Sequence, residues 1–428
     1  MLEVALLDGD DEDGIDHPDP KDLMFDPWLT LSPAAQHWTS GYVEAVIHEL
    51  SPKGRQARSE LREGIATIIP TLMANLMVLH RTRPKGSRLV VGLRHLRKTR
   101  YDRKGMRRLS DVLRVLEVTG LIHRKGGEFK KLRTTILAIG RLKHQLLDPA
   151  VSLADVVKAE GEELIRLAAR PNKPRIAGRK QPKVPTDYDD TAETRRMRKE
   201  LEEINAFLGK QEITLEGGEV PPFRLIRYFL LKRKGDPKTF NQHGRLYGGF
   251  WMTLKATERH RLRINGEPIA DLDYASMFPR LAYAHLGLKA PDGDLYAIPG
   301  LEGHREGAKA AFSALLSYPK DMKVLPARVR KQLPSGWNAK RVRQAFADRY
   351  PELSGLFECD KGLDLMFTES RILLATMREL MRQGVPALPM HDGMMVPWTM
   401  SDFAIRTMEG AARDRINFAL PVTIKSAT

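Results

Sequence analysis

Cysteine is almost absent from this chain of 428 residues, and long apolar runs are absent too. The single Cys359 excludes an internal disulfide and a cysteine-rich zinc site, so folding must rest on burial and hydrogen bonding. No apolar run approaches the roughly 20 residues that a membrane span needs. The acidic, polar segment from Met1 to Lys21 lacks the features of a secretory signal. We therefore expect a cytoplasmic protein, nucleoid-associated if bacterial, with no membrane partner.

Basic residues outnumber acidic ones in the sequence. The 70 Lys and Arg residues against 54 Asp and Glu give a net charge of +16 and a sequence pI near 9.8. This balance favours polyanionic partners, nucleic acid first among them, although a solvated basic surface would give the same totals. The length of the chain predicts two or three domains.

The sequence divides into four expected segments. Residues 1–27 mix clustered acids with Pro and Gly and are expected to form an acidic flexible tail. Residues 28–150 carry mostly helical patterns and are expected to form a winged-helix-like DNA-binding domain. A basic, proline-rich linker is expected over 151–192, most clearly from 170 to 189, where apolar residues are scarce. Residues 193–428 form the second half, which carries the candidate chemistry.

The winged-helix prediction depends on a helix that is followed by a basic hairpin. Residues 104–122 place apolar side chains on one helical stripe and arginines on the other faces, and residues 120–139 resemble two strands joined at a Gly-Gly turn. A winged helix inserts one helix into the major groove and lays its hairpin along the DNA backbone. A helical domain with a solvated charged rim would show the same pattern. The basic residues expected at duplex DNA are Arg107, Arg108, Arg124, Lys125, Lys130, Lys131 and Arg133.

An acidic strand in the second half is the first candidate site. Residues 264–287 predict an Asn-Gly turn, an apolar strand with Asp271 and Asp273 on one face, and a helix that begins near Pro279. Carboxylates at the end of a strand suit Mg²⁺, which prefers hard oxygen ligands and keeps positions open for substrate phosphates. Solvated aspartates on a surface strand are the ordinary alternative. For Asp271 two roles stay open, a metal ligand or a partner of a nearby arginine.

A second acidic motif lies in residues 385–398, where two apolar strands meet at His391, Asp392 and Gly393. An Asp-Gly pair between apolar runs is also an ordinary hairpin turn. If this hairpin lies beside the Asp273 strand, Asp273 and Asp392 would bridge two metal ions about 3.5 to 4 Å apart. One ion would activate a 3′ hydroxyl and the other would neutralise the leaving pyrophosphate.

A basic helix is expected between the two acidic motifs, over residues 303–320. Arg305, Lys309 and Phe312 follow each other at i, i+4 and i+7, so they share one helical face. Two cations and an aromatic ring on one face would clamp a triphosphate and stack on a base. A solvated basic stripe is the alternative.

The order of these elements resembles that of family A DNA polymerases. GRLYGGFW at 244–251 resembles the GRLSS element of the family, DYASMFPR at 273–280 resembles its DYSQIELR, and REGAK at 305–309 resembles the R-x-x-x-K start of the fingers helix. MHDG at 390–393 resembles the HDE of motif C, and FALPVTIK at 418–425 resembles the closing strand of the palm. The resemblance covers the second half only. It implies an α+β fold in which a right-hand palm, with an antiparallel sheet and small helical fingers, follows the winged-helix domain.

The resemblance also implies roles for individual residues. Asp273 and Asp392 would bind two Mg²⁺ ions, with the Tyr274 carbonyl as a further ligand and Mn²⁺ as a substitute metal. Arg305 and Lys309 would hold the triphosphate of an incoming dNTP. The other residues expected at the nucleotide or the DNA are Phe312, Tyr318 (one residue out of register with the family tyrosine), Arg245 in the minor groove of the primer-template, Arg280, and His391 near the primer end.

Three departures from the family pattern bear on mechanism. Gly393 replaces a glutamate that is not one of the two essential metal ligands, so the change is tolerable. Ser313 replaces an aromatic residue, for which the neighbouring Phe312 can substitute. Phe278 stands where family A has glutamate and where the D-F-x-S-L-Y-P motif of family B has a sugar-excluding tyrosine, so we expect a preference for deoxynucleotides. The first half shows no acidic pattern of a 3′ to 5′ exonuclease, and proofreading is not expected.

These patterns favour a template-dependent DNA polymerase that uses dNTPs on a primer-template, in the replication of a plasmid, phage or integrated mobile element. One alternative is a replication initiator in which the polymerase fold has decayed into a DNA-binding module. Another is a primase or an enzyme like the single-subunit RNA polymerases. The joint presence of Asp273, Asp392, Arg305 and Lys309 argues against decay, and Phe278 argues against ribonucleotide use.

Overall fold

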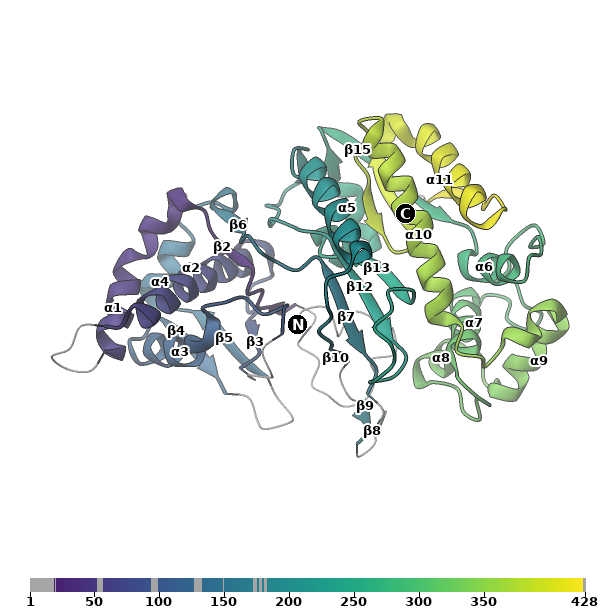
Figure 1. The fold of residues 1–428 in the computed structure, drawn as a ribbon, viewed down its shortest axis with the longest axis horizontal. Helices are drawn as coiled ribbons and strands as arrows, with labels where there is room; N and C mark the ends of the chain where they lie inside the picture. Colours follow the sequence, from purple (N-terminus) through teal and green to yellow (C-terminus); the bar gives the residue numbers. More distant parts are fainter. Residues whose placement is uncertain are drawn as a thin grey trace.

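The computed structural model describes residues 19, 21–51, 57–93, 99–126, 133–148, 150–171, 175–176, 179–180 and 183–425. These residues form an α+β protein with two hydrophobic cores (Figure 1). The first core gathers buried side chains between Leu29 and Val156, and the second gathers those between Leu164 and Leu420. Most of the expected acidic tail, residues 1–18 and 20, lies outside the described residues.

One long helix organises the first core. α2 (Ser59–Thr82) runs without a break through Pro70, and most of its side chains are buried. Three shorter helices pack against it: α1 (Ser40–Leu50), α3 (Leu109–Val118) and α4 (Gly140–Leu146). The accompanying sheet has the strand order β1-β3-β5-β4, with bounds Leu23–Met24, Leu89–Val91, Thr134–Ala138 and Ile122–Lys125. The two strands expected within 120–139 are therefore present as the antiparallel pair β4 and β5.

α2 is also long and apolar enough to cross a membrane, contrary to the expectation that the chain holds no such segment. Its most apolar window has a mean hydropathy of 1.3, and 78% of that window is buried inside the protein. Ile65, Ile68, Ile69 and Leu72 are fully buried in the first core. Packing therefore accounts for α2 as a core helix, and its hydropathy is weak evidence for a membrane segment.

The expected linker over 151–192 contributes strands to both cores. β6 (Val156–Lys158) pairs with β2 (Leu29–Leu31) in the first part. β7 (Ile165–Ala169) lies between β10 (Val184–Pro185) and β12 (Ile226–Leu231), and most of its side chains are buried. The linker expectation is wrong for these strands because the apolar run around Ile165 can bury itself against β12. The basic stretch between β7 and β10 contains a short hairpin of β8 (Arg175–Ile176) and β9 (Arg179–Lys180).

Two sheets form the second core. The first has the order β10-β7-β12-β13, where β13 spans His243–Tyr247. The second has the order β11-β14-β15-β17-β16, with β18 added to β15. The strands of this second sheet are β11 (Ile213–Leu215), β14 (Leu262–Ile264), β15 (Glu267–Tyr274), β16 (Leu388–Met390), β17 (Gly393–Pro397) and β18 (Val422–Lys425).

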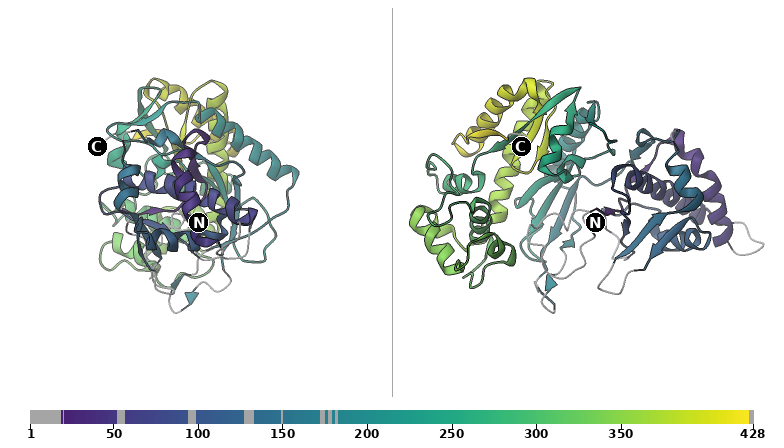
Figure 2. Two further views of the ribbon diagram at one scale, coloured as in Figure 1. Left: turned by 90° about the vertical axis from the view of Figure 1, so that its left-hand side faces the viewer. Right: turned by 180° about the vertical axis from the view of Figure 1, so that it is seen from behind.

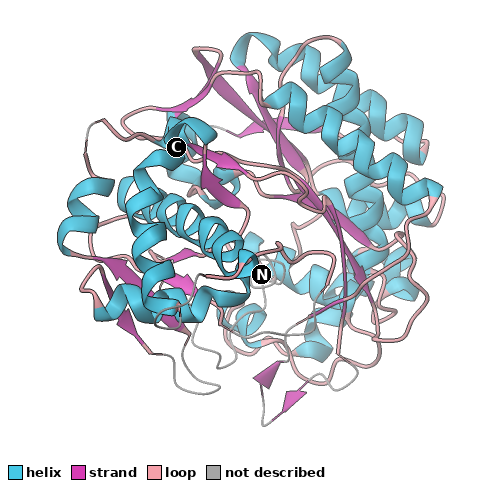
Figure 3. Ribbon diagram, turned by 60° about the vertical axis from the view of Figure 1, so that its left-hand side comes forward, coloured by secondary structure: helices cyan, strands magenta, loops and turns pink. Residues whose placement is uncertain are grey.

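The helix α10 (Gly362–Arg382) connects these sheets, because it packs against β13 and also against α5, α6, α7 and α11. The remaining helices are α5 (Ala192–Leu208), α6 (Met277–His285), α7 (Arg305–Ser317), α8 (Ala327–Gln332), α9 (Ala339–Arg349) and α11 (Ser401–Ile416). Figures 1 and 2 place the N-terminal part and α7 to α9 at opposite ends of the molecule, with β7, β12 and β13 between them. Figure 3 shows the long strands of the second part running between groups of helices.

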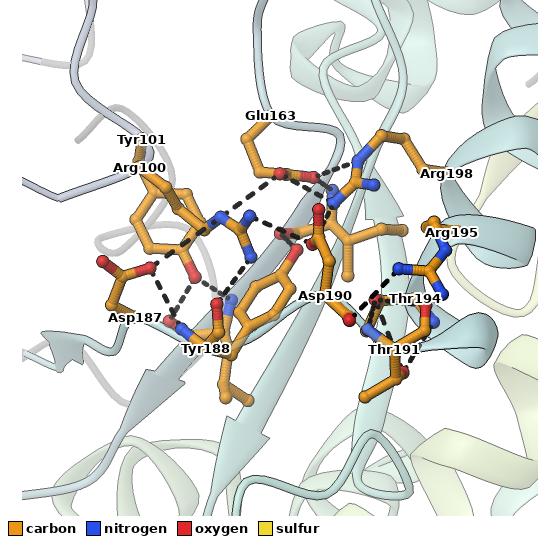
Figure 4. A network of polar contacts seen from close by, with 12 residues as sticks. Arg100, Tyr101, Glu163, Asp187, Tyr188, Asp190, Thr191, Thr194, Arg195 and Arg198 are labelled. Atoms are coloured by element: carbon orange, nitrogen blue, oxygen red, sulfur yellow. Dashed lines mark hydrogen bonds and ion pairs between the residues drawn. The ribbon is translucent and has the colours of Figure 1, made fainter.

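A polar network around Arg100 joins the two parts (Figure 4). The Arg100 guanidinium lies 3.4 Å from the Glu163 carboxylate, 3.0 Å from that of Asp190, and 3.9 Å from the centre of the Tyr188 ring. Both Glu163 oxygens also accept hydrogen bonds from Arg198 of α5. A residue of the first part is thus enclosed by carboxylates of the second.

Tyr101 and Arg81 add further links between the parts. The Tyr101 hydroxyl donates to the Thr186 carbonyl oxygen at 2.7 Å and accepts from the Leu167 N–H at 3.0 Å. At the end of α2, Arg81 pairs with Glu219 at 2.7 Å. Because these contacts combine buried hydrogen bonds with ion pairs, they hold the first part in a defined position against β7 and β10.

Candidate active site

The register of β15 brings the two acidic motifs together. β15 lies between β17 and β18 and is antiparallel to both. Asp273 is opposite Gly393 of β17, so Asp392 in the preceding turn lies directly beside the Asp273 position. The condition set by the sequence, that the hairpin lies beside the Asp273 strand, is met.

Gly393 permits the close approach of these strands. A Cβ atom at this position would lie 2.2 Å from the Leu272 carbonyl oxygen and 2.9 Å from Asp273 Oδ1. Such contacts are too short for any side chain, so glycine is required here by packing. The departure from the family glutamate therefore has a local cause, and it leaves the space in front of Asp273 free of a side chain.

Asp273 and Asp392 differ in their electrostatic environment. Burial and the charge of Asp392 raise the pKa of Asp273 to about 6, although Lys425 opposes this shift. Burial also disfavours ionisation of Asp392, but the charges of Lys309, Arg245 and Lys425 outweigh it and hold the pKa of Asp392 below its usual value. At neutral pH the site therefore presents two neighbouring carboxylates, of which Asp273 is the more easily protonated.

The two oxygens of the Asp273 carboxylate differ in their contacts. Its Oδ2 lies 2.8 Å from the Lys425 ammonium, whereas its Oδ1 is buried and has no hydrogen-bond partner among the described residues. Mg²⁺ fits an unpaired hard oxygen beside a second carboxylate. In the described part of the chain, no group of three or more His, Cys, Asp or Glu side chains could hold a metal. A Mg²⁺ site here would therefore rely on Asp273 and Asp392 together with backbone oxygen, water and substrate phosphates, as Mg²⁺ sites commonly do.

Asp271 lies on the same face of β15 as Asp273, and its Oδ1 is likewise buried without a hydrogen-bond partner among the described residues. Asp271 Oδ2 lies 3.3 Å from the Arg259 guanidinium. Of the two roles left open by the sequence, the structure shows the arginine partner. Tyr274 ends β15, and its buried hydroxyl donates to the Met408 carbonyl oxygen at 2.7 Å. The backbone carbonyl of Tyr274, which is the expected further metal ligand, directly follows Asp273 in the chain.

The helix α7 brings Lys309 to the two aspartates. The Lys309 side chain is half-buried, and its charge acts on both Asp273 and Asp392. No hydrogen bond or ion pair engages its ammonium within the described residues. Arg305 lies one turn earlier and is about half exposed, but Asp294 holds it through two contacts of 2.6 and 3.1 Å. Lys309 is therefore free to meet a substrate, whereas Arg305 would have to leave Asp294.

Phe312 does not reach the surface of α7. Its side chain is fully buried, and its ring packs near Phe346, Phe357 and Tyr296 at centroid distances of 5.3, 6.1 and 6.3 Å. The expectation that Phe312 stacks on a base is wrong, because α9 and the segment before α10 cover this part of the helix. Tyr318 follows α7 and packs half-buried against the same core.

Arg245 of β13 is tied to a buried carboxylate. Its guanidinium donates to both oxygens of Glu369 in α10, at 2.7 and 2.8 Å. Glu369 is fully buried, and burial outweighs the charge of Arg245 and raises the pKa of Glu369 to about 7. The two-point contact has the geometry of an arginine–carboxylate pair. The Arg245 side chain is 17% exposed. The expected contact with the minor groove would therefore involve only this small exposed part.

Phe278 and His391 border this pair. The Phe278 ring is largely buried in the first turn of α6 and lies 5.9 Å from the Arg245 guanidinium. His391 adopts a left-handed backbone conformation with φ of 52°, and its ring lies 6.1 Å from that of Tyr247. Burial and the charge of Arg245 lower the pKa of His391 to about 4, so the imidazole is neutral at neutral pH.

Arg280 is a structural residue. Its guanidinium donates to the carbonyl oxygens of Ala275, Pro291 and Gly293, and the side chain is buried. The expectation that Arg280 contacts DNA is therefore wrong. Its donors instead hold the loop that follows α6 against the end of β15.

The basic residues of the first part lie around α3 and β4. Arg107 and Arg108 are 80% and 57% exposed before α3, where Arg108 pairs with Asp111 at 3.0 Å. Arg124 is largely covered and lies 3.8 Å from Glu117, whereas Lys125 and Arg133 are exposed. Lys130 and Lys131 lie outside the described residues.

Two site residues escaped the sequence analysis. Glu369 falls on the apolar stripe of α10, between Leu365 and Ile372, and an acid on such a stripe is a usable signal for a buried ion pair. Lys425 ends the last strand, and only the pairing of β18 with β15 brings it to Asp273.

A scan against models of known protein families finds no match for this sequence, and a search of curated proteins finds none either. A functional proposal for this chain therefore depends on the geometry of the site and on the motif resemblance.

Proposed function

We propose that the chain is a template-dependent DNA polymerase that transfers a deoxynucleotide from a dNTP to a 3′ hydroxyl. The observation that carries the proposal is the antiparallel pairing of β15 with β17, which sets Asp273 beside Asp392. These are the two positions at which the family A resemblance implies metal ligands. The half-buried Lys309 acts on both, in keeping with a triphosphate-binding role.

The proposed reaction is one nucleophilic displacement at phosphorus, to which several residues of the site would contribute. The 3′ oxygen forms a bond to the α-phosphorus, the bond from this phosphorus to the bridging oxygen breaks, the hydroxyl proton passes to water, and pyrophosphate leaves. Two Mg²⁺ ions held by Asp273 and Asp392 would supply activation of the hydroxyl and neutralisation of the pyrophosphate. Lys309 would hold the triphosphate in line, and Arg305 would join it on exchanging Asp294 for phosphate. Phe278 would limit the space for a ribose 2′ hydroxyl.

The architecture supports a palm with small fingers. An antiparallel sheet that carries both acidic motifs packs against α11, which in turn packs against α10, and α7, α8 and α9 form a compact helical group next to α10. In the first part, the succession β3, α3, β4 and β5, with β3 and β4 on either side of β5, supports a winged helix. Exposed Arg107 and Arg108 at the start of α3 fit a contact with duplex DNA. We extend the proposal to replication of a mobile element in the cytoplasm.

Primer extension with matched carboxylate variants tests this proposal. A labelled primer on a DNA template is incubated with Mg²⁺ and either dNTPs or rNTPs. We expect the wild type to add dNTPs, Asp392→Asn to add none, and Asp271→Asn, which alters a carboxylate on the same strand face as Asp273, to retain incorporation. Use of rNTPs would favour an RNA-synthesising enzyme, and no addition with either nucleotide would favour a DNA-binding initiator.

A further inference from the structure

The carboxylates around the candidate site are matched by basic side chains. Three such pairs are in direct contact: Asp271 with Arg259, Asp273 with Lys425, and Glu369 with Arg245. Among the described residues no side chain contacts Asp392 in this way, but the charges of Lys309, Arg245 and Lys425 act on it. The site is therefore close to electroneutral as the protein stands, which weakens its attraction for a divalent cation.

Lys425 differs from the other two contacting cations in how firmly it is held. Arg245 and Arg259 are 17% and 19% exposed and are fixed by the surrounding core, whereas the Lys425 side chain is 44% exposed. Lys425 is also the last residue of β18, a strand whose described pairing is with β15. Its ammonium can therefore turn into solvent without loss of core packing.

The contact of Lys425 with Asp273 is selective. In the strand register Lys425 is opposite Asp271, yet its ammonium contacts Asp273, two residues along the same face of β15, while Arg259 contacts Asp271. The Oδ2 atom of Asp273 is thereby paired with a cation, whereas the buried Oδ1 has no hydrogen-bond partner among the described residues. The ammonium thus occupies one of the oxygens that a metal ion would use.

We propose that Lys425 is a resident counter-cation of Asp273, which a divalent metal ion must displace when it binds. This inference rests on the proposed function, since it takes Asp273 to be a metal ligand. In this arrangement Lys425 relieves the repulsion between Asp273 and Asp392 before the metal arrives. It also weakens metal binding until a triphosphate contributes its own negative charge.

Titration of the full-length protein with Mn²⁺ tests the inference without any catalytic readout. Bound Mn²⁺ is measured by electron paramagnetic resonance at pH 8, in the absence of nucleotide and DNA. We expect Lys425→Met to bind Mn²⁺ about three- to ten-fold more tightly than the wild type, as removal of one nearby cation should allow. Lys425→Arg keeps the charge and should bind like the wild type. Lys210→Met removes an exposed lysine at the end of α5 and should also leave the affinity unchanged.

The Asp273→Asn variant distinguishes failure of the proposed role of Lys425 from failure of the proposed metal site. If Asp273→Asn removes the Mn²⁺ binding of the wild type and Lys425→Met leaves the affinity unchanged or weaker, the counter-cation role is wrong and the proposed metal site stands. If the wild type shows no binding that depends on Asp273, the metal site fails and the inference fails with it. Thermal melting of each variant shows whether a loss of binding reflects unfolding.

Discussion

Replacing Asp273 by asparagine should stabilise the metal-free protein while it abolishes nucleotide incorporation. The pKa of Asp273 is raised from 3.8 to about 6 by burial and by Asp392, so the folded protein holds this proton more tightly than the unfolded chain does. Ionised Asp273 therefore lowers the free energy of unfolding. Two pKa units correspond to about 3 kcal/mol at most, since one unit is about 1.4 kcal/mol.

The sign of this effect fixes its pH dependence. Below about pH 4 the Asp273 carboxyl is protonated in both the folded and the unfolded protein, so the asparagine variant has no stability advantage there. The advantage of the variant should grow between about pH 4 and pH 6, and stay constant above that range. Scanning calorimetry in EDTA at pH 4 and pH 8 measures the difference, at about 1 °C per kcal/mol for 428 residues that unfold together.

Asp294→Asn is a control in which the substitution should change the stability of the protein in the opposite direction. Burial raises the pKa of Asp294, but hydrogen bonds from Arg305 and Ser276 outweigh it and lower the pKa overall. Asp294→Asn should therefore destabilise the protein at pH 8, with a loss that fades as the pH falls below about 4. If Asp273→Asn proves less stable than the wild type at pH 8, or if its effect does not change with pH, the electrostatic description of the site is wrong.

Three further predictions concern residues around the site and in the first part. Glu369→Ala leaves the Arg245 guanidinium buried without its carboxyl partner and should cost about 3 to 5 kcal/mol in urea unfolding; a loss below 1 kcal/mol would contradict a stabilising pair of Arg245 and Glu369. Phe312→Ala should cost about 3 to 5 kcal/mol through the cavity it creates, and a selective rise in the KM for dNTP at unchanged stability would restore the stacking role. Charge reversal at Arg107 and Arg108 should weaken duplex binding and reduce its salt slope by about one unit per lost phosphate contact. An unchanged slope in fluorescence anisotropy would remove both arginines from the interface.

The central pair of aspartates could be predicted from sequence because its determinants are local. Alternation along a strand places Asp273 on a face, and an Asp-Gly turn between apolar runs predicts a hairpin. Only the adjacency of β15 and β17 was a hypothesis, carried by the order of the motifs. The strands of the expected wing were predicted for the same local reason.

The incorrect sequence predictions concern residues whose surroundings depend on tertiary packing. Phe312 shares a helical face with Arg305 and Lys309, but spacing does not reveal that other segments cover the second half of α7. Arg280 was expected at DNA, and its spacing does not reveal that the carbonyl oxygens of Pro291 and Gly293, more than ten residues away in sequence, hold its guanidinium. The linker prediction was wrong for β7 because the basic, proline-rich composition is confined to 170–189, whereas the apolar residues just before it form a buried strand against β12.

The measurement that tests the central claim most directly is addition of a single nucleotide to a primer on four templates that differ only in the next base. The wild type should add the complementary dNTP on each template, and Asp273→Asn and Asp392→Asn, each correctly folded by calorimetry, should add none. Addition that ignores the template base, or addition that survives both substitutions, would contradict a templated transfer at the Asp273 and Asp392 site.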